Sequence, residues 1–599
     1  MRQLFEKLLE DWCDGLLKLQ VEDIKLPGLY GGILCPACAR IHGRCVDAVY
    51  PLMHMASRTG EDRYFDAAIR LMQWSDNVRQ LDGSYYNEVA IALWKGITVF
   101  AATAIADALT FHGQLLDTKT RELWTGHLRL TAEYLYDHVT LKGWPINYPA
   151  GCSYTMVLLG KLLDEPRFNR RGRELAHGCM DFLTAENKLL SGEGGSQPSN
   201  RRPAIDLGYN VEESLPGLVL YAKAAKDDEI IEAVTDSLKS HLEFMLPDGA
   251  WDNSYGTRNY KWTYWGSRTA DGCQPAYALL AEKLAEKEPA FAEAVYRNTK
   301  LLESCTHDGL LYGGPHYVSH GVAPCVHHTF CHAKALATVL DHGAADCRRE
   351  NVHLPRENGP GVYEFPEIRT YLVSTGPWRG TITAYAWQYN DSQHASGGAP
   401  SMLWHEKLGP ILVGSLADYV MIEPSNMQVN HDQFQMSLTP RLELNCNDTP
   451  YTNVRDHNAE VTYDQQEAEI SFSVRAKLVD KKQADPPEGD SFCRIQYLFT
   501  PDGLDILASM EQPGAWGQLN FVLPIISKTG EKVQQLSEDH IRVEKPDGCI
   551  DVFSNASFRI MACDGQRVFN HVPGFEAVPL VVDWKPNENP ELKIRMEID

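Results

Sequence analysis

Aromatic and basic side chains are concentrated in one stretch, residues 251–274, with the sequence WDNSYGTRNYKWTYWGSRTADGCQ. It contains six Trp or Tyr residues, two arginines and a lysine, but neither a helical nor an alternating apolar period. Aromatic faces stack on the C–H faces of a sugar ring, and Arg or Asn side chains bind its carboxylate and hydroxyl groups. We therefore interpret the stretch as a wall of a sugar-binding cleft, with a loop that fills the core as the alternative.

These residue types suit β-elimination at a uronic acid. That reaction needs a group that neutralises the carboxylate, a base that removes the C5 proton, and an acid that protonates the oxygen leaving C4. We predict Tyr260 as base or acid, His316 or His328 as its partner, and Arg258 as the neutralising group. The predicted substrate-binding residues are Tyr255, Trp262, Tyr264, Arg268 and Gln274 in this stretch, and Asn87, Tyr209, Asn210, His42 and Arg44 elsewhere.

Histidine, the usual general base near neutral pH, is concentrated in GGPHYVSHGVAPCVHHTFCHAKALA. We expect at least one histidine of this segment to contact substrate, and the others to be structural. From the C-terminal part of the chain, His394 or His405 could also reach the cleft.

A metal site is predicted in CPACARIHGRC. Cys35, Cys38, His42 and Cys45 have the spacing C-x2-C-x3-H-x2-C, which could hold a structural zinc ion in a closed tetrahedral site. The alternative is that the cysteines are small packing residues, while His42 and Arg44 face the cleft. The predicted chemistry itself requires no cofactor.

Two other functions use the same residues. A glycoside hydrolase would need two carboxylates at a defined separation, and the available ones are Asp47, Glu88, Asp206, Glu212, Asp252 and Asp271. A non-catalytic glycan-binding protein would use the aromatic residues without the histidines. A lyase product absorbs ultraviolet light through its new double bond, which distinguishes the three classes.

The pattern along the chain predicts a multidomain α+β protein. Twelve amphipathic segments, near 2–20, 43–59, 62–79, 86–112, 118–138, 150–163, 167–185, 210–225, 228–245, 272–286, 290–305 and 326–342, indicate six helix pairs. We expect these pairs to form an (α/α)6 toroid over residues 1–345, followed by a charged, Pro- and Gly-rich linker at 346–365.

Residues 366–599 have the alternation of antiparallel strands. Ile470, Phe472, Val474 and Ala476 would lie on one face, and Pro-Asp-Gly turns at 501–503 and 546–548 indicate hairpins. We predict a β-sandwich.

Composition limits the partners and the location. With a net charge of −24, the chain lacks the basic surface that nucleic acids require, and its apolar runs are too short to span a membrane. The N-terminus lacks the pattern of a signal peptide, and the 15 irregularly spaced cysteines are typical of free thiols. Both features predict a cytoplasmic location; the alternative is that a signal peptide has been removed from this chain. The oligomeric state is not predicted.

The segments CPACARIHGRCVDAVYP, WDNSYGTRNYKWTYWGSRTADGC and GGAPSMLWHEKLGP, in this order, resemble polysaccharide lyase family 27, the L-rhamnose-α-1,4-D-glucuronate lyases of Bacteroides-type bacteria. SMLWHEKLGP is also similar to heparinase II/III-like lyases. The resemblance implies an exo-acting lyase that removes rhamnose from glucuronate on arabinogalactan-type side chains and leaves an unsaturated uronate. It also implies a periplasmic location, contrary to the N-terminus and the cysteines.

Overall fold

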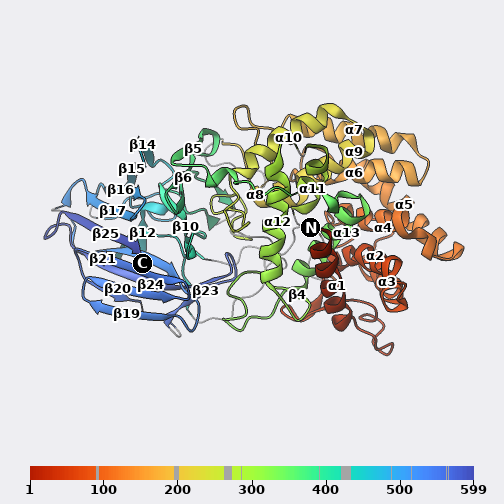
Figure 1. Ribbon diagram of the computed structural model, residues 1–599, viewed down its shortest axis with the longest axis horizontal. Helices are drawn as coiled ribbons and strands as arrows, with labels where there is room; N and C mark the ends of the chain where they lie inside the picture. The colour runs from red at the N-terminus through yellow and green to blue at the C-terminus, as the bar shows by residue number, and fades with distance from the viewer. Residues whose placement is uncertain are drawn as a thin grey trace.

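The computed structural model spans residues 1–599 and describes all but 90–93, 194–201, 262–272, 285, 348, 390–391, 420–433, 488, 514–515, 562 and 564–565; the side chains of 388, 389, 392 and 393 are also not described. The N-terminal part is helical and the C-terminal part is made of antiparallel sheets (Figure 1). None of the helices in these described ranges combines the length and the apolarity needed to cross a bilayer.

The helices follow the amphipathic pattern closely. They are α1 Arg2–Leu19, α2 Val49–Thr59, α3 Asp62–Trp74, α4 Thr98–His112, α5 Thr118–His138, α6 Asn147–Leu162, α7 Pro166–Met180, α8 Leu207–Tyr209, α9 Leu215–Ala225, α10 Asp228–Leu242, α11 Gln274–Leu284, α12 Pro289–Ser304 and α13 Val326–Asp341. A π-helical turn at 210–214 joins α8 to α9, and a 3-10 helix at 43–48 precedes α2. Gly60 ends α2 in the left-handed conformation, at φ 72°.

Alternate helices form an inner ring. Contacts run from α2 to α4, α6, α9, α11 and α13, and from α13 back to α2. The outer helices pack mainly on one inner helix each, as α3 does on α2, α7 on α6 and α12 on α11. The inner helices are apolar around most of their circumference, as in α4, because they are covered on both sides.

One predicted helix start is wrong. We expected a helix from residue 86, but α4 begins at Thr98, and the described residues between 85 and 97 form turns. The apolar residues of NEVAIALWKG have a helix-like spacing, which led to the wrong prediction. In the structure the backbone of Asn87 instead bonds to Trp94 (N to O 2.9 Å) and to Gly43 (O to N 2.8 Å).

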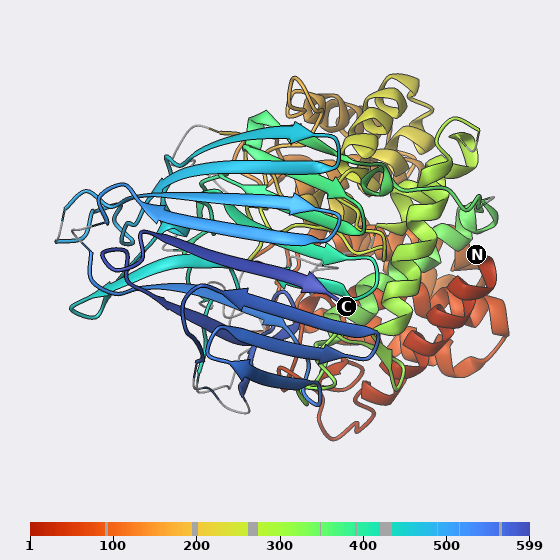
Figure 2. The ribbon, with the colours of Figure 1, turned by 60° about the vertical axis from the view of Figure 1, so that its left-hand side comes forward.

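Three larger sheets form the C-terminal part, which Figure 2 shows from the side of the long strands. The first is β11-β10-β7-β6-β5, with β5 Gly361–Phe365, β6 Thr370–Thr375, β7 Trp378–Thr383, β10 Ala399–His405 and β11 Gly409–Val413. The second is β13-β12-β18-β24-β22 with β23 beside β24, where β12 is Arg441–Cys446, β13 Thr449–Thr452, β18 Leu519–Ile526, β22 Phe558–Ile560, β23 Val568–Asn570 and β24 Phe575–Trp584.

The third sheet has the order β14-β15-β16-β17-β25-β21-β20-β19. Its strands are β14 Glu460–Gln466, β15 Glu469–Lys477, β16 Phe492–Thr500, β17 Gly503–Met510, β19 Lys532–Ser537, β20 His540–Lys545, β21 Gly548–Ser554 and β25 Glu591–Ile598. The short pairs are β1 Leu34–Cys35 with β2 Arg40–Ile41, β3 Thr306–His307 with β4 Leu310–Leu311, and β8 Gln388–Tyr389 with β9 Ser392–Gln393.

The strand predictions agree with the structure at their clearest points. Ile470, Phe472, Val474 and Ala476 are all buried on one face of β15. Both Pro-Asp-Gly turns close hairpins, with Thr500 opposite Gly503 and Lys545 opposite Gly548. The strand β5, however, lies within the residues assigned to the linker.

Candidate active site at the rim of the helical ring

The polar-aromatic loops meet at one rim of the helical ring. Each of them connects an outer helix to the start of the next inner helix, so the alternation of helices brings them to the same end. Contacts between the loops confirm this: Trp94 Nε1 donates to the Tyr148 hydroxyl (2.8 Å), and Thr257 N donates to Ile205 O (2.9 Å).

The described part of the aromatic stretch, 251–261, is a series of turns fixed by a buried carboxylate. Asp252 Oδ2 accepts from Arg356 Nη1 (3.0 Å), and Asp252 Oδ1 accepts from the Ser254 hydroxyl (2.7 Å). The Ser254 oxygen also lies 2.7 Å from Ser401 Oγ on β10 and accepts a hydrogen bond from that hydroxyl. The segment therefore lies between the helical ring and the first sheet and is held from both sides.

Two cations and two phenols lie together in this segment and its neighbour. Arg258 Nη1 donates to the Tyr260 hydroxyl (3.3 Å), and Lys261 Nζ donates to the Tyr209 hydroxyl (3.0 Å). The Arg258 guanidinium carbon is 5.2 Å from the centre of the Tyr209 ring. A cation at hydrogen-bond distance from a phenol oxygen stabilises the phenolate that a base must form. The structure thus places Tyr260 and Arg258 together, and adds Lys261.

A buried acid accompanies Arg258. Glu193 Oε1 is 2.8 Å from Arg258 Nε, and Glu193 is fully buried. Burial raises the pKa of Glu193 to about 7, while the charge of Arg258 opposes the shift. When Glu193 is ionised it balances the charge of Arg258, so the cation is most available to a substrate carboxylate when Glu193 is protonated.

Inside the ring, a second network joins the starts of three inner helices to α13. Arg44 Nη1 donates to Glu213 Oε1 (2.8 Å), and Asn147 Nδ2 donates to Glu213 Oε2 (2.6 Å). Lys334 Nζ and Arg44 Nε both donate to Asp47 Oδ2, at 3.0 and 3.2 Å. A cavity of about 50 Å³ borders Glu213 and Lys334. Arg44 is thus engaged by carboxylates rather than directed into an open cleft.

Several residues predicted to bind substrate are packed in the interior instead. Tyr255 is fully buried with its ring 4.7 Å from that of Phe244, and Gln274 Nε2 donates to Asn298 Oδ1 (2.9 Å). Asn210 Nδ2 donates to Leu190 O (2.7 Å). These three side chains hold the loops in place.

The other residues that were predicted to bind substrate lie in different parts of the structure. Asn87 is buried, and its backbone is hydrogen-bonded to Gly43 and to Trp94. Tyr209 lies at the cation cluster described above. Trp262, Tyr264 and Arg268 lie outside the described residues.

His316 and His328 lie near the C-terminal part of the chain. His316 Nδ1 accepts from the backbone N–H of Glu576 (3.1 Å), its ring meets Phe575, and burial lowers its pKa to about 3. His328 is buried near Gly313 and Tyr317; the Tyr317 hydroxyl donates to His571 O (3.0 Å). These contacts serve to join the two halves of the molecule.

His394 is the histidine that the structure brings to the aromatic segment. Its ring faces the backbone of Thr257 and lies 5.8 Å from the Tyr385 ring. Within the described chain, neither ring nitrogen has a partner in hydrogen-bonding geometry, although His394 is buried. Burial lowers the pKa of His394 to about 3. His405 instead packs on Trp378.

Three of the four predicted metal ligands lie together. Cys35, Cys38 and His42 are grouped with Cys325, which precedes α13, and their ligand atoms all lie within 4.8 Å of one another. Cys45 is not a member of this group, because it is buried in the 3-10 helix that follows His42. The choice of Cys45 was therefore wrong, since the fourth thiol comes from a distant part of the chain.

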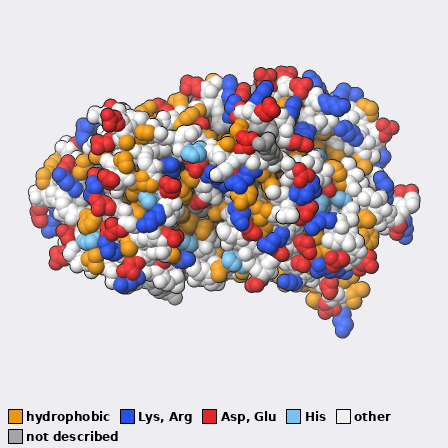
Figure 3. Space-filling model, in the orientation of Figure 1, with side chains coloured by type: hydrophobic (Ala, Val, Ile, Leu, Met, Phe, Trp, Pro, Cys, Tyr) orange, Lys and Arg blue, Asp and Glu red, His pale blue; other side chains and the backbone are white. Residues whose placement is uncertain are grey.

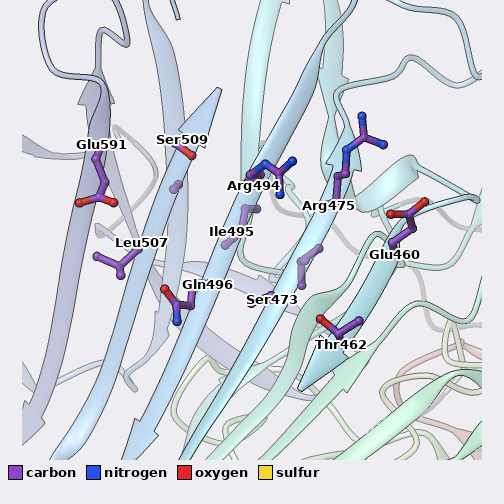
Figure 4. Close-up of a pocket in the computed structure, with 12 residues that line it drawn as sticks. Glu460, Thr462, Ser473, Arg475, Arg494, Ile495, Gln496, Leu507, Ser509 and Glu591 are labelled. Carbon is purple, nitrogen blue, oxygen red and sulfur yellow. The ribbon is translucent and has the colours of Figure 1, made fainter. Parts of the chain in front are cut away.

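The pocket in Figure 4 lies on the third sheet, and has a volume of about 340 Å³. Its walls are side chains of β14–β17 and β25, and include neither Tyr nor His. Both of its arginines, Arg475 and Arg494, pair with Glu511 at 2.8 and 2.9 Å. This pocket lacks the proton-transfer groups that the rim contains.

Comparison with known proteins identifies the family. The ulvan lyase N-terminal domain matches residues 9–357, and the ulvan lyase C-terminal domain matches residues 362–599. A broad-specificity ulvan lyase of Formosa agariphila is 40% identical over 592 residues, which cover 97% of this chain and 91% of the relative. The chain belongs to the ulvan lyase family.

Solved structures agree on the fold. Heparinase III is similar with a TM-score of 0.56 at 9% identity, covering 92% of this chain and 75% of the other. A chondroitin AC lyase of Streptomyces coelicolor A3 has a TM-score of 0.54 at 12% identity, covering 100% and 79%. This ulvan lyase family member is thus a polysaccharide lyase, and neither the hydrolase nor the glycan-binding alternative is favoured.

Three residues of the candidate active site and metal site were not predicted from the sequence. Lys261 lies within the aromatic stretch, and Glu193 lies in the segment that also contains the predicted substrate-binding residues Tyr209 and Asn210, but neither was predicted. Cys325 did have a signal, because it stands beside the clustered histidines in APCVHH.

Proposed function

We propose that this lyase cleaves ulvan, or a closely related polysaccharide containing uronate, by β-elimination at the rim of the helical ring. The observation that carries the proposal is the cluster of Arg258, Tyr260, Lys261 and Tyr209 on a segment held between ring and sheet. The substrate follows the broad-specificity ulvan lyase of Formosa agariphila. Lys and Arg side chains also gather near the middle of the face in Figure 3, where an anionic chain would bind.

In this proposal Tyr260 removes the C5 proton, and Arg258 with Lys261 balances the uronate carboxylate as charge moves onto it. The inner helices α6, α9 and α11 begin at this rim, and the positive ends of their dipoles add to the attraction for an anion. Tyr209, bonded to Lys261, is the second phenol available for proton transfer.

His394 is the proposed partner of Tyr260, in place of His316 or His328. It faces the backbone of Thr257 in the same segment, and the described residues give its buried ring nitrogens no hydrogen bond that meets the usual geometry. A substrate carboxylate beside the ring would favour the protonated form, which could then protonate the leaving oxygen. His316, by contrast, uses Nδ1 to hold the backbone of Glu576.

The finer predictions remain part of this proposal. We infer that the ring of inner helices is an (α/α)6 toroid and that the stacked sheets form a sandwich. We further propose a linkage between rhamnose and glucuronate as the bond cleaved, and exo-action as its mode. Viscosity measured against double-bond formation tests the mode: an exo-enzyme forms product with little early loss of viscosity.

The decisive experiment measures ultraviolet absorbance of the new double bond with ulvan as substrate. We expect Tyr260→Phe to lower kcat roughly 10²- to 10⁴-fold, as loss of a general base does. Tyr255→Phe is the matched control, because that ring is buried against Phe244. Near-normal turnover of a folded Tyr260→Phe would reject Tyr260 as the base and leave Tyr209 to be tested.

A second set of variants tests the histidine. His394→Ala should lower kcat, and added imidazole, which can occupy the space left by the buried ring, should restore part of the activity. His316→Ala should instead lower the melting temperature, since it removes a contact between the halves. Full activity in His394→Ala would contradict its assignment.

A further inference from the structure

The group formed by Cys35, Cys38, His42 and Cys325 lies apart from the proton-transfer groups and has its own geometry. Cys325 Sγ is 3.8 Å from Cys35 Sγ, 3.9 Å from Cys38 Sγ and 4.0 Å from His42 Nε2. Cys35, His42 and Cys325 are fully buried, and Cys38 is half-buried. These separations are far longer than a disulfide bond of about 2.05 Å, so the sulfurs are thiols.

The separations match those of a tetrahedral metal site. Zinc–sulfur bonds of about 2.3 Å place two sulfurs in a tetrahedron about 3.8 Å apart. The two measured sulfur–sulfur distances, 3.8 and 3.9 Å, agree with this value. Packing alone brings cysteines together at many distances, and does not require three thiols and an imidazole nitrogen to face one point.

The orientation of His42 is an independent observation. Its Nδ1 lies 2.5 Å from Glu88 Oε1, so the other nitrogen, Nε2, is the one directed at the sulfurs. A histidine that binds zinc usually donates its second N–H to a carboxylate, which fixes the ring and its tautomer. Arg40 Nε is 3.5 Å from Glu88 Oε2 and partly balances that charge.

Groups around the thiols also suit a metal thiolate. His327 Nδ1 is 3.5 Å from Cys325 Sγ, and its ring lies 4.2 Å from that of His42. An N–H donated to a thiolate offsets part of the negative charge that three cysteinates bring to one ion. The site thus has four protein ligands, a carboxylate behind the histidine, and a donor beside one sulfur.

We propose that these four residues bind one zinc ion in a closed, structural Cys3His site. Binding releases the thiol protons to solvent, and leaves no open position for substrate or water. The ion would join three segments: the β1–β2 hairpin, the loop of Glu88, and the start of α13. Arg44 follows His42 by two residues and Lys334 lies on α13, so the ion would also stabilise the Asp47 network.

Two other groups of histidine and acid are less suited to a metal. Asp341 lies between His54 and His112, but its two oxygens already accept from both rings and from Tyr50. In the other group Glu229 is exposed and His177 is half-buried, while Asp227 is buried and caps α10. Among the described residues, neither group includes a cysteine.

The first test measures metal in the full-length enzyme, purified without chelator, by inductively coupled plasma mass spectrometry. We expect about one zinc per chain. Wild-type enzyme with less than about a tenth of an equivalent, also after incubation with zinc and desalting, would overturn the proposal.

Variants identify the ligands. Cys325→Ser should lose most of the zinc, whereas Cys45→Ser and Cys331→Ser, both of buried cysteines outside the group, should keep it. Retention of a full equivalent by Cys325→Ser would reject this ligand set, and loss by Cys45→Ser would restore the set predicted from the sequence.

Cobalt substitution of the wild-type enzyme provides a second test of the ligand set, which applies even if Cys325→Ser does not fold. Wild-type enzyme in which cobalt replaces zinc should show the visible and near-ultraviolet bands of a tetrahedral cobalt thiolate. The spectrum of an octahedral cobalt ion without thiolate bands would overturn the proposal. Removal of zinc should also lower the melting temperature by roughly 5 °C or more, whether or not the chain cleaves ulvan.

Discussion

At the scale of single residues, the candidate site combines groups whose charges depend on one another. Arg258 contacts Tyr260 on one side and Glu193 on the other. A buried acid beside a catalytic cation lets protonation control how much positive charge faces the substrate. Lys261 is bonded to Tyr209, and its charge also lowers the pKa of Glu193, so both cations are coupled to the protonation of that acid.

The raised pKa of Glu193 predicts how the free energy of unfolding depends on pH. Its pKa is raised from 4.5 to about 7 by burial, so between these values the folded state holds a proton that the unfolded chain has released. The free energy of unfolding must therefore fall as pH rises from 4.5 to 7, by about 3 kcal/mol for this group. Glu193→Gln should reduce that fall, measured by urea unfolding at several pH values.

The control for this experiment is Glu364→Gln, a carboxylate exposed on β5. It should leave the pH dependence of unfolding unchanged. An identical slope in wild type and Glu193→Gln would show that Glu193 is ionised throughout this range in the folded protein.

At the scale of elements, the aromatic segment is a loop whose shape is imposed by the buried Asp252–Arg356 pair. Both side chains are almost fully buried, and Arg356 lies in the connection to the first sheet. Removing one partner of a buried pair leaves the other charge uncompensated, which costs about 3 to 5 kcal/mol. Arg356→Leu should therefore destabilise the fold by that amount, and lower kcat because Arg258 and Tyr260 lose their positions.

Arg559→Leu is the matched control, since Arg559 pairs with Asp583 at 3.0 Å on the surface. Exposed pairs contribute at most about 1 kcal/mol, so this variant should remain near wild type in chemical unfolding and in turnover. Equal effects of the two substitutions would contradict the role given to Asp252.

The elements themselves were largely predictable, because apolar periodicity reports burial directly. Hairpins such as 49–59 with 62–74, and the strand at 469–477, follow from short-range patterns. The site was predictable only in part. Tyr260 and Arg258 are close in sequence, whereas Cys325 reaches Cys35 across 290 residues, and only the closure of the helical ring brings them together. His394 likewise arrives from another domain.

At the scale of the whole molecule, the rim is completed by the C-terminal part of the chain. Arg356, Ser401 and His394 contact segment 251–261, and the loop before α13 meets β24. Activity should therefore depend on the packing between the helical ring and the C-terminal sheets. This includes contacts made by residues that have no reactive side chain.

Gly314 and Gly574 provide the test of this dependence. A Cβ at Gly314 would lie 2.5 Å from Gly574 Cα, which is backbone and cannot move aside without shifting the loop or the strand. Gly314→Ala should lower the melting temperature by several degrees, and lower kcat on ulvan, although Gly314 has no side chain to donate. Gly126→Ala on α5, where a Cβ meets nothing within 4 Å, is the control and should match or exceed wild-type stability. Unchanged turnover in a destabilised Gly314→Ala would show that the rim keeps its shape without this contact.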